Sequence, residues 1–403
     1  MSNNNSNVQV HILHVIVSMD PVVGGPCQGI RNLDQAMQDK GIVREVVCLD
    51  APDAAFLGKD SFKIHAIGPP HGPWRYSPRL KEWLRANVGR FDVIIINGLW
   101  IYHSYAAWKV IKNLKAKNLI KKVPRVLVMP HGMLDPYFQR AKERWHKAIR
   151  NWLYWKLIES KVVNDADGLL FTCQTELLLA RETFRPYHPK KEYNAGYGIK
   201  QPPHFKPEMA DAFYKQCLNV KGKQFLLYLS RIHPKKGVDM LLRSYIKLYE
   251  VRKDIPSLVI AGPGWDSLYG QKLKEYLTSK TAPVFPVDML SDDSKWGAFY
   301  ECEAFILPSH QENFGIALVE ALACGKPGLI SNQVNIWVEV QSEGGGIVEC
   351  DTDKGTYQLL EKWVNLTIEE KVLMGQRAKN TYENHFTVDT IVENYLAAFA
   401  EQL

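Results

Sequence analysis

The chain has 403 residues with 46% hydrophobic side chains, 23% charged side chains and a net charge of +7, an ordinary soluble composition able to bury two sizeable cores. The seven cysteines are scattered, odd in number and without a C-x-x-C pair, which argues against a disulfide framework or a zinc site and for reduced thiols in the cytosol. The first residues are polar and no apolar run approaches the length of a bilayer span, so we expect neither a signal peptide nor a transmembrane helix.

The first half of the chain alternates strand-like and helix-like segments. Residues 8–20 are predicted as a first strand, followed by a glycine turn at Gly24-Gly25 and an amphipathic helix that ends at Gly41. Further strands are predicted at residues 44–49, 92–96, 125–129 and 168–172, with helices between them. This alternation predicts βαβ units and a parallel sheet.

A basic and aromatic helix is predicted at residues 140–161, inside a segment (residues 108–161) that carries ten Lys and four Arg against three acids. Five of its side chains share one stripe, namely Trp145, Ala148, Ile149, Trp152 and Leu153. We favour core packing of this stripe with a solvated basic face. The alternative is contact with an anionic membrane or lipid phosphate, which would make a cytoplasmic protein peripheral to the inner face of the membrane.

The second half begins after residues 198–222, which hold few apolar residues in register and are predicted to be a linker. Buried strands are predicted at residues 224–230, 257–262, 283–287, 304–309 and 327–332, with helices between them. The sequence therefore predicts two doubly wound α/β domains, residues 1–200 and 201–385. Apolar side chains at helical spacing from Val388 to Phe399 predict a terminal helix within residues 386–403.

Glu312 and Glu320 surround the predicted start of a helix near Gly315, directly after a buried strand. Their spacing is a little over two helical turns. Open α/β sheets bind ligands at the carboxyl ends of strands, where a helix N-terminus favours an anion such as diphosphate. Ionised carboxylates accept hydrogen bonds from hydroxyl groups. A phosphate beside sugar hydroxyls describes a nucleotide sugar.

Two cations follow another predicted strand. Arg231 comes directly after it, and Lys236 lies five residues on, where a helix begins. A guanidinium fork and an ammonium suit a diphosphate. Gly262 and its neighbours, in AGPGWDS, permit close backbone approach but lack the third glycine of the dinucleotide fingerprint.

In the first half, His131-Gly132 follows a predicted strand and shares the carboxyl edge of the sheet with Gly24-Gly25. A ligand contact and an ordinary structural role remain equally open for His131. Asn97-Gly98 occupies a similar position, where an ordinary turn is favoured. The D-x-D matches at residues 165–167 and 351–353 lie in unsuitable places, so no metal site is predicted.

Together these motifs resemble the retaining glycosyltransferases of family 4, which have the GT-B architecture of two Rossmann-like domains facing a cleft. The resemblance covers nearly the whole chain and is strongest at residues 225–240 and 284–332. Its motifs are SRIHPKKG, IAGPG and LPSHQENFGIALVEALACGKPGLIS in the second half, with GG, PHGML and FTCQTE in the first.

The resemblance implies that Arg231 and Lys236 hold the diphosphate of the donor, that Glu320 binds ribose hydroxyls, and that Glu312 contacts the donor sugar. It implies that His131 lies across the cleft near the anomeric carbon, and that the last helix crosses back to the N-terminal, acceptor-binding domain. Catalytic roles fall to Glu312, His131, Arg231 and Lys236. The implied donor-binding set is Gly24, Gly25, Arg231, Lys236, Gly262, Met289, Leu290, Glu312, Asn313, Phe314, Gly315, Ile316 and Glu320. Asp288 stands where the family usually has Gly, beside the expected base.

The predicted function is metal-independent transfer of a hexosyl group, without a cofactor, from a UDP- or GDP-linked sugar to a hydroxyl of a glycan, lipid-linked or small-molecule acceptor. Front-face attack and double displacement remain open as mechanisms. The alternatives are a GT-B sugar-nucleotide epimerase, a phosphorylase, or a non-catalytic binder of nucleic acid or sugar nucleotide. No nucleic-acid partner is expected.

Overall fold

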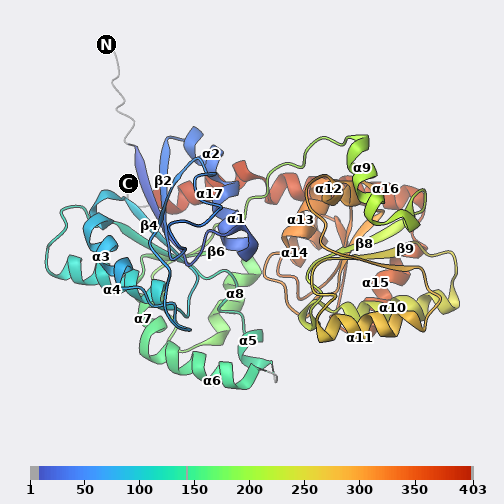
Figure 1. Cartoon of the computed structure of the whole chain (residues 1–403), viewed down its shortest axis with the longest axis horizontal. Coiled ribbons are helices and arrows are strands. Elements are labelled where there is room, and N and C mark those ends of the chain that lie inside the picture. Colours follow the sequence, from blue (N-terminus) through green and yellow to red (C-terminus); the bar gives the residue numbers. More distant parts are fainter. Residues whose placement is uncertain (1–8, 142–143, 401–403) are drawn as a thin grey trace, which may run out of the picture. The chain divides into compact units, whose positions relative to one another are not determined.

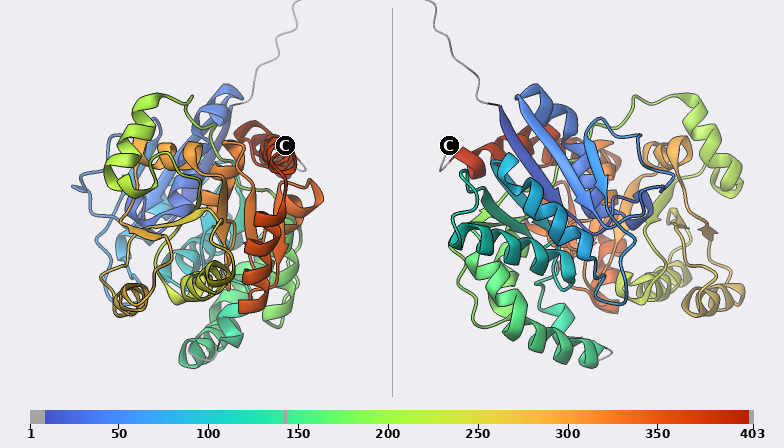
Figure 2. Two further views of the ribbon diagram at one scale, coloured as in Figure 1. Left: turned by 90° about the vertical axis from the view of Figure 1, so that its right-hand side faces the viewer. Right: turned by 60° about the vertical axis from the view of Figure 1, so that its left-hand side comes forward.

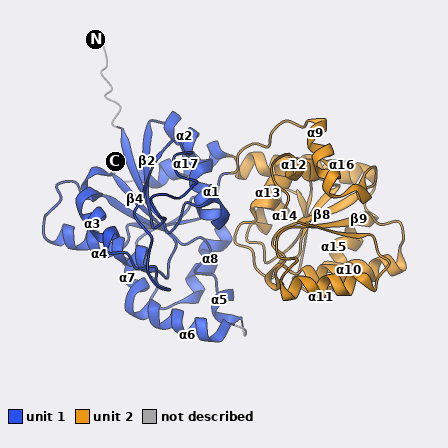
Figure 3. Cartoon of the chain, viewed as in Figure 1, with its two compact units in different colours: residues 1–198, 388–403 blue, residues 199–387 orange. Residues whose placement is uncertain are grey.

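The computed structural model describes residues 9–141 and 144–400. They form two compact units (Figure 1, Figure 3). Unit 1 holds the described residues up to Gly198 together with those from Val388 onward, and unit 2 is Ile199–Thr387. Each unit contains one parallel sheet with helices on its faces, which confirms the predicted α/β class. Among the described residues, none of the helices combines the length and apolarity that crossing a membrane requires.

The sheet of unit 1 has seven strands in the order β3-β2-β1-β4-β5-β6-β7, and all its strand pairs are parallel. The strands are β1 (Val10–Val15), β2 (Ile42–Cys48), β3 (Lys63–Ala66), β4 (Val93–Asn97), β5 (Arg125–Met129), β6 (Gly168–Phe171) and β7 (Glu192–Asn194). The central strands β1, β4 and β5 are apolar along nearly their whole length, as expected for a sheet buried on both faces.

The helices of unit 1 cover both faces of this sheet (Figure 2). They are α1 (Gly25–Asn32), α2 (Asp34–Asp39), α3 (Pro78–Asn87), α4 (Tyr102–Ala116), α5 (Tyr137–Arg140), α6 (Trp145–Tyr154), α7 (Ser160–Asp165), α8 (Gln174–Thr183) and α17 (Val388–Ala400). Alternate residues of β1 show the two layers, because Leu13 packs with α3 and α4 while Ile12 packs with α2 and α17. Five apolar residues of α17 are buried in the second layer, namely Ile391, Val392, Tyr395, Ala398 and Phe399.

The sheet of unit 2 has six parallel strands in the order β10-β9-β8-β11-β12-β13. They are β8 (Phe225–Leu229), β9 (Ser257–Ala261), β10 (Val284–Val287), β11 (Ala304–Leu307), β12 (Gly328–Ser331) and β13 (Gly346–Glu349). The helices are α9 (Pro207–Gln216), α10 (Val238–Val251), α11 (Leu268–Thr278), α12 (Asp292–Glu301), α13 (Ile316–Ala323), α14 (Trp337–Ser342), α15 (Asp353–Asn365) and α16 (Ile368–His385). All five strands predicted for this half are present.

The predicted linker is wrong over much of its length, because α9 occupies Pro207–Gln216 and packs on α12. Met209 and Phe213, four residues apart, form its buried side, and a proline at the first turn suits a helix start. The strands β3, β7 and β13 were not predicted. Their side chains are mostly half-buried or exposed, so they lack a continuous apolar run.

The prediction that the apolar stripe in residues 140–161 packs in the core is also wrong. The segment contains α6, which continues through a π-helical turn (Trp155–Glu159) into α7, and residues 142–143 lie outside the described part. Trp145, Ile149, Trp152 and Leu153 are exposed. The buried side of α6 is formed instead around Asn151.

Candidate functional site

The parallel sheet of unit 2 brings most of the predicted site residues to one edge. Strands β10, β9, β8 and β11 are neighbours, and the loop after each leaves at the carboxyl edge. Arg231 and Lys236 follow β8, Gly262 follows β9, Met289 and Leu290 follow β10, and residues 312–316 follow β11. The geometry is therefore that of a ligand-binding edge of an open sheet.

Lys236 and Glu312 form an ion pair at this edge. Lys236 ends a short 3-10 turn (Pro234–Lys236), and its side chain is almost fully buried. The following Gly237 has φ +67°, and a Cβ there would lie 2.2 Å from the carbonyl oxygen of Pro308. Only glycine lets the turn after β8 pack this closely on the end of β11, which sets the ammonium beside the carboxylate.

Backbone hydrogen bonds fix the turn that carries Glu312. The Glu312 N–H donates to the carbonyl of Gln333 at 2.9 Å, and the Asn335 N–H donates to the carbonyl of Glu312 at 2.9 Å. The His310 N–H donates to the carbonyl of Lys235 at 2.9 Å. The loops after β8, β11 and β12 are therefore joined into one rigid rim. His310 also contacts Asp351 at 3.1 Å, and this hydrogen bond raises the pKa of the imidazole.

The helix after this rim begins at Ile316, which confirms the predicted start near Gly315. Gly315 precedes it in the left-handed conformation with φ +83°, and no side chain caps the helix. The first N–H groups of a helix have no intrahelical acceptor, so this end of α13 can meet an anion. Phe314 is buried and packs edge-on against Phe386, with ring centroids 5.5 Å apart.

Glu320 lies in the second turn of α13 and pairs with Lys295 of α12. The Lys295 Nζ lies 2.8 Å from Glu320 Oε1, and both side chains are partly exposed. The sequence analysis did not identify Lys295. It lies 25 residues away and has no motif of its own, so only the tertiary structure reveals the pair.

The backbone at Ser230 and Arg231 packs closely against Gly262. The Arg231 side chain is exposed and makes no hydrogen bond or ion pair with the described residues. A Cβ on Gly262 would lie 2.0 Å from the carbonyl oxygen of Ser230, so this glycine is needed for packing between two strand ends. Met289 is 66% exposed whereas the Leu290 side chain is buried.

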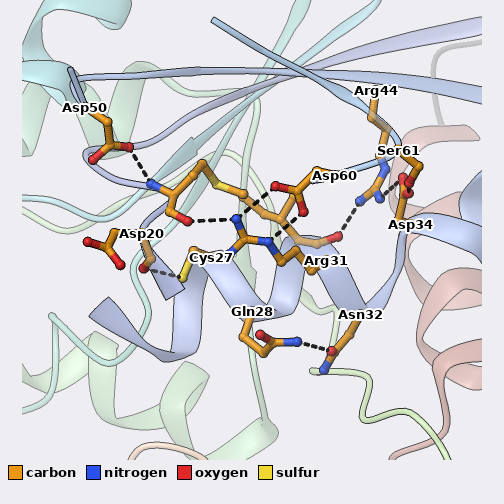
Figure 4. Close-up of polar contacts among 12 residues, drawn as sticks. Asp20, Cys27, Gln28, Arg31, Asn32, Asp34, Arg44, Asp50, Asp60 and Ser61 are labelled. Atoms are coloured by element: carbon orange, nitrogen blue, oxygen red, sulfur yellow. Dashed lines mark hydrogen bonds and ion pairs between the residues drawn. The ribbon is translucent and has the colours of Figure 1, made fainter. Parts of the chain in front are cut away.

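In unit 1, polar side chains hold the loop that carries Gly24-Gly25 (Figure 4). Arg31 donates to Asp60 at 2.7 Å and to the carbonyl of Met19 at 2.8 Å, and Asp50 accepts from the Met19 N–H at 2.7 Å. Gly24 has φ +92° with no atom within 4 Å of a Cβ position, so its conformation rather than crowding favours glycine.

His131 follows β5 and belongs to a chain of three polar side chains. Asn97 Nδ2 donates to the carbonyl of Ile95 at 3.1 Å and faces His14 Nδ1 at 3.3 Å, which directs Asn97 Oδ1 to His131 Nε2 at 3.1 Å. Because an amide oxygen only accepts, His131 carries its proton on Nε2. Burial lowers the pKa of His131 to about 4, so the ring is neutral near pH 7.

Glu176, from the FTCQTE motif, holds the loop after β5 that carries His131. It is buried and accepts from the Gly132 N–H at 2.5 Å, and its other oxygen accepts from the Thr172 N–H at 2.8 Å. His14, Asn97 and His131 also line one small cavity in unit 1. Sequence reasoning missed His14 and favoured an ordinary turn at Asn97, because only the order of β1, β4 and β5 in the sheet brings them together.

The D-x-D carboxylates face cations. Asp165 pairs with Lys112 at 2.7 Å, and Asp167 pairs with Lys190 at 2.8 Å. Asp353 contacts Arg243 at 2.9 Å. Over residues 9–141 and 144–400, the structure contains no group of three His, Cys, Asp or Glu side chains arranged to hold a metal ion.

Two family models match this chain, and together they cover most of it. Residues 211–381 match the model described as glycosyl transferases group 1. Residues 24–189 match the glycosyl transferase 4-like domain. The first model lies within unit 2 and the second within unit 1.

Curated relatives match over part of their length. The D-inositol 3-phosphate glycosyltransferase of Thermobispora bispora is 28% identical over 180 residues, 42% of this chain and 41% of the relative. The N,N'-diacetylbacillosaminyl-diphospho-undecaprenol alpha-1,3-N-acetylgalactosaminyltransferase of Campylobacter jejuni is 27% identical over 210 residues, 51% of this chain and 52% of the relative. The chain thus spans about half the length of the curated relatives it matches.

Solved structures agree with the fold over nearly the whole chain. A glycosyltransferase from Rickettsia africae superposes with a TM-score of 0.76 at 12% identity, covering 98% of both chains. HepE from Anabaena, in complex with UDP and glucose, gives a TM-score of 0.70 at 15% identity, covering 97% of this chain and 99% of that one. The fold and both family matches lead to one conclusion: the chain belongs to glycosyltransferase group 1, family 4, and has the GT-B fold.

Proposed function

We propose that the chain transfers a hexosyl group, with retention and without a metal, from a nucleotide-diphosphate sugar to a hydroxyl acceptor. The observation that carries this proposal is the cluster at the carboxyl edge of unit 2. Three features lie close together there, on the loops that follow neighbouring strands. They are the Lys236–Glu312 ion pair, the exposed guanidinium of Arg231 and the uncapped start of α13.

The reaction needs positive charge where the leaving group forms. Breaking the bond between sugar and phosphate places negative charge on the diphosphate, and Arg231, Lys236 and the α13 N–H groups would stabilise it. The Lys236 ammonium has three donor hydrogens, so it can keep Glu312 and still donate to a phosphate oxygen. Arg231 can supply both of its terminal nitrogens to the phosphate, since its side chain has no partner among the described residues.

The two carboxylates would hold the hydroxyl groups of the donor. Glu320 Oε1 contacts Lys295, which leaves Oε2 to accept from a ribose hydroxyl. Glu312, with Asn313–Ile316, would meet the transferred sugar. His131 would contribute a neutral imidazole toward that sugar, because its pKa of about 4 keeps it uncharged. Gly24, Gly25, Gly262, Met289 and Leu290 complete the proposed donor site.

The relatives suggest classes of donor and acceptor to test. HepE has been solved in complex with UDP-glucose, so UDP-glucose is the first donor to test and GDP sugars are the second. The names of two relatives contain a phosphorylated acceptor, D-inositol 3-phosphate and diphospho-undecaprenol. We therefore include phosphorylated and lipid-linked alcohols among the acceptors.

The test is thermal stabilisation of the purified chain by UDP, GDP and ADP sugars, followed by measurement of nucleotide release with and without acceptors. A ligand that binds only the native state raises the melting temperature. The proposal expects acceptor-dependent UDP or GDP release, unaffected by a chelator and weakened in Glu312→Gln. Conversion of the donor without any acceptor would indicate an epimerase, and dependence on free phosphate would indicate a phosphorylase. Either result would overturn the proposal.

A further inference from the structure

The α6 helix and the π-helical turn after it expose an apolar face. Five large apolar side chains are between 48% and 66% exposed, namely Trp145, Ile149, Trp152, Leu153 and Leu157. They recur at i, i+4, i+7, i+8 and i+12, so they lie on one side of the helix. We call these five residues the α6 face. An amphipathic helix of a soluble protein normally turns such a stripe toward the core.

The opposite side of the segment is firmly anchored, so the exposure is a property of the fold. Trp155 is fully buried and stacks on Phe184, with ring centroids 4.8 Å apart. Tyr154 accepts a hydrogen bond from Trp74 Nε1. Glu159, at the end of the π-helical turn, is fully buried and accepts from the Trp100 N–H at 2.8 Å. The α6 face therefore points outward because the other side is occupied.

The charged side chains within the segment that carries the α6 face are of one sign. From Trp145 to Leu157 the chain contains three cations, Lys147, Arg150 and Lys156, and no acid. All three are exposed. The Lys156 ammonium lies 4.0 Å from the centroid of the Trp152 ring, within the face itself. Apolar and aromatic side chains are thus interleaved with positive charge.

We propose that the α6 face docks on an anionic membrane surface. Helices that lie in the membrane interface combine Trp and Leu on one side with Lys and Arg beside them, and they bind by burying apolar area and attracting anionic lipid. Figure 1 shows α6 at the rim of unit 1, and its packing partners are α5 and the π-helical turn. The proposal rests on these contacts and exposures and does not depend on the transferase activity.

A second copy of the chain is a poorer occupant. A two-fold symmetric dimer places the same surface patch of both copies together. Pairing two α6 faces in this way would bring Lys147, Arg150 and Lys156 against the same three cations, with no acid from Trp145 to Leu157 to offset them. A membrane that carries anionic lipid removes this repulsion.

The experiment is flotation of the full chain with phosphatidylglycerol-containing vesicles and with phosphatidylcholine vesicles. We expect binding to the anionic vesicles that weakens with salt, since surface electrostatics are screened. Arg150→Gln should lower the partition coefficient about fivefold, because each cation near an anionic surface contributes about that factor. Trp152→Glu should lower it by more than about tenfold, since it removes apolar contact and adds repulsion.

The matched control is Leu268→Glu, which changes a leucine that is 81% exposed at the start of α11 in unit 2. It should float as the unchanged chain does. Circular dichroism melts of all variants check folding without use of a donor, so failure here is distinct from failure of the proposed function. Equal flotation of Trp152→Glu and Leu268→Glu, or no binding to anionic vesicles, would overturn the inference. A concentration-dependent dimer that Trp152→Glu abolishes would assign the α6 face to self-association and overturn it as well.

Discussion

Lys236 and Glu312 form an ion pair in which the lysine side chain is 6% exposed and the glutamate side chain 21% exposed. The two residues are 76 positions apart in the chain, and they meet because β8 and β11 are adjacent in the sheet. A buried ammonium with one carboxylate partner is costly unless its remaining donors are also satisfied. A phosphate oxygen beside it would satisfy one of them. The pair is therefore both a structural link and the centre of the proposed anion site.

Replacing Lys236 with Met should lower kcat/KM for donor turnover by about 10²–10³-fold, the usual effect of losing one group that stabilises negative charge in a transition state. The methionine keeps the apolar stem, so the loss reports the ammonium. Glu312 would then lack its partner, but its partial exposure limits the cost in stability to about 1–3 kcal/mol. Steady-state kinetics and a denaturant midpoint measure the two effects.

The exposed Lys272 of α11 provides the matched control, Lys272→Met. A Lys236→Met enzyme with full turnover would remove Lys236 from the site.

Lys295 should act through Glu320. The ammonium lies 2.8 Å from Glu320 Oε1 and fixes that carboxylate on α13. Lys295→Met should raise the KM for the donor about 5–20-fold, the cost of losing a charged hydrogen bond at a partly exposed position, with a smaller change in kcat. Lys295→Arg should recover most of the loss. If kcat falls and KM does not move, Lys295 takes part in the chemical step and the assignment as a positioning residue is wrong.

Most strands that could be predicted from sequence are buried on both faces, and the edge strand β10 is an exception. In β4, four apolar residues follow one another, and a sheet covered by helices on both sides requires such a run. The edge strand β7 has only Glu192, Tyr193 and Asn194, so no local pattern distinguishes it from a loop. Similarly, the helical spacing of the apolar residues in α6 correctly predicted that they share one side of the helix. Periodicity does not determine which way that side points, because this depends on what the neighbouring elements bury.

The residues of the candidate site also fall into two groups: those that local sequence signals identify and those that only the tertiary structure reveals. Glu312, Glu320, Arg231 and Lys236 could be found because strand ends and helix starts are local signals, and a parallel sheet must bring its strand ends to one edge. Lys295 could not be found. Its partner Glu320 lies on another helix, α13, and no spacing in the chain encodes that contact. The same reason explains the missed contact between His14 and Asn97.

Asn97 should set the protonation of His131. Its amide oxygen accepts from His131 Nε2 at 3.1 Å, and burial holds the pKa of His131 at about 4. In Asn97→Asp a carboxylate would face the ring and raise that pKa, because a nearby negative charge favours the imidazolium. If the neutral ring is the active form, the acid limb of the kcat/KM profile should move to higher pH.

The pH profile of Asn97→Asp is compared with that of Asn113→Asp, which changes an exposed residue of α4. The control should keep the acid limb of the unchanged chain. A loss of activity at all pH values without a shift of the limb would mean that Asn97 supports the loop and does not tune His131.

Glu159 should make the fold more stable in mild acid than in base. Its carboxylate is fully buried, Oε1 accepts from the Trp100 N–H at 2.8 Å and from Ser104 Oγ at 2.7 Å, and Oε2 is buried without a hydrogen bond. Burial raises the pKa of Glu159 from 4.5 to about 7. The folded state therefore holds a proton that the unfolded state releases at lower pH. The stabilisation is complete below pH 4.5 and is lost as the pH rises through about 7.

The size of this loss is about 3 kcal/mol, from a pKa difference between the unfolded value of 4.5 and the folded value of about 7. Denaturant midpoints measured at about pH 5 and about pH 8 should differ in the unchanged chain. Glu159→Gln cannot ionise, so it should be less stable than the unchanged chain in acid, where its amide lacks a partner, but should lose no further stability in base. Glu82→Gln, on the exposed side of α3, is the control and should keep the original pH dependence. An unchanged pH dependence in Glu159→Gln would show that the carboxyl group is ionised in the folded chain across this range.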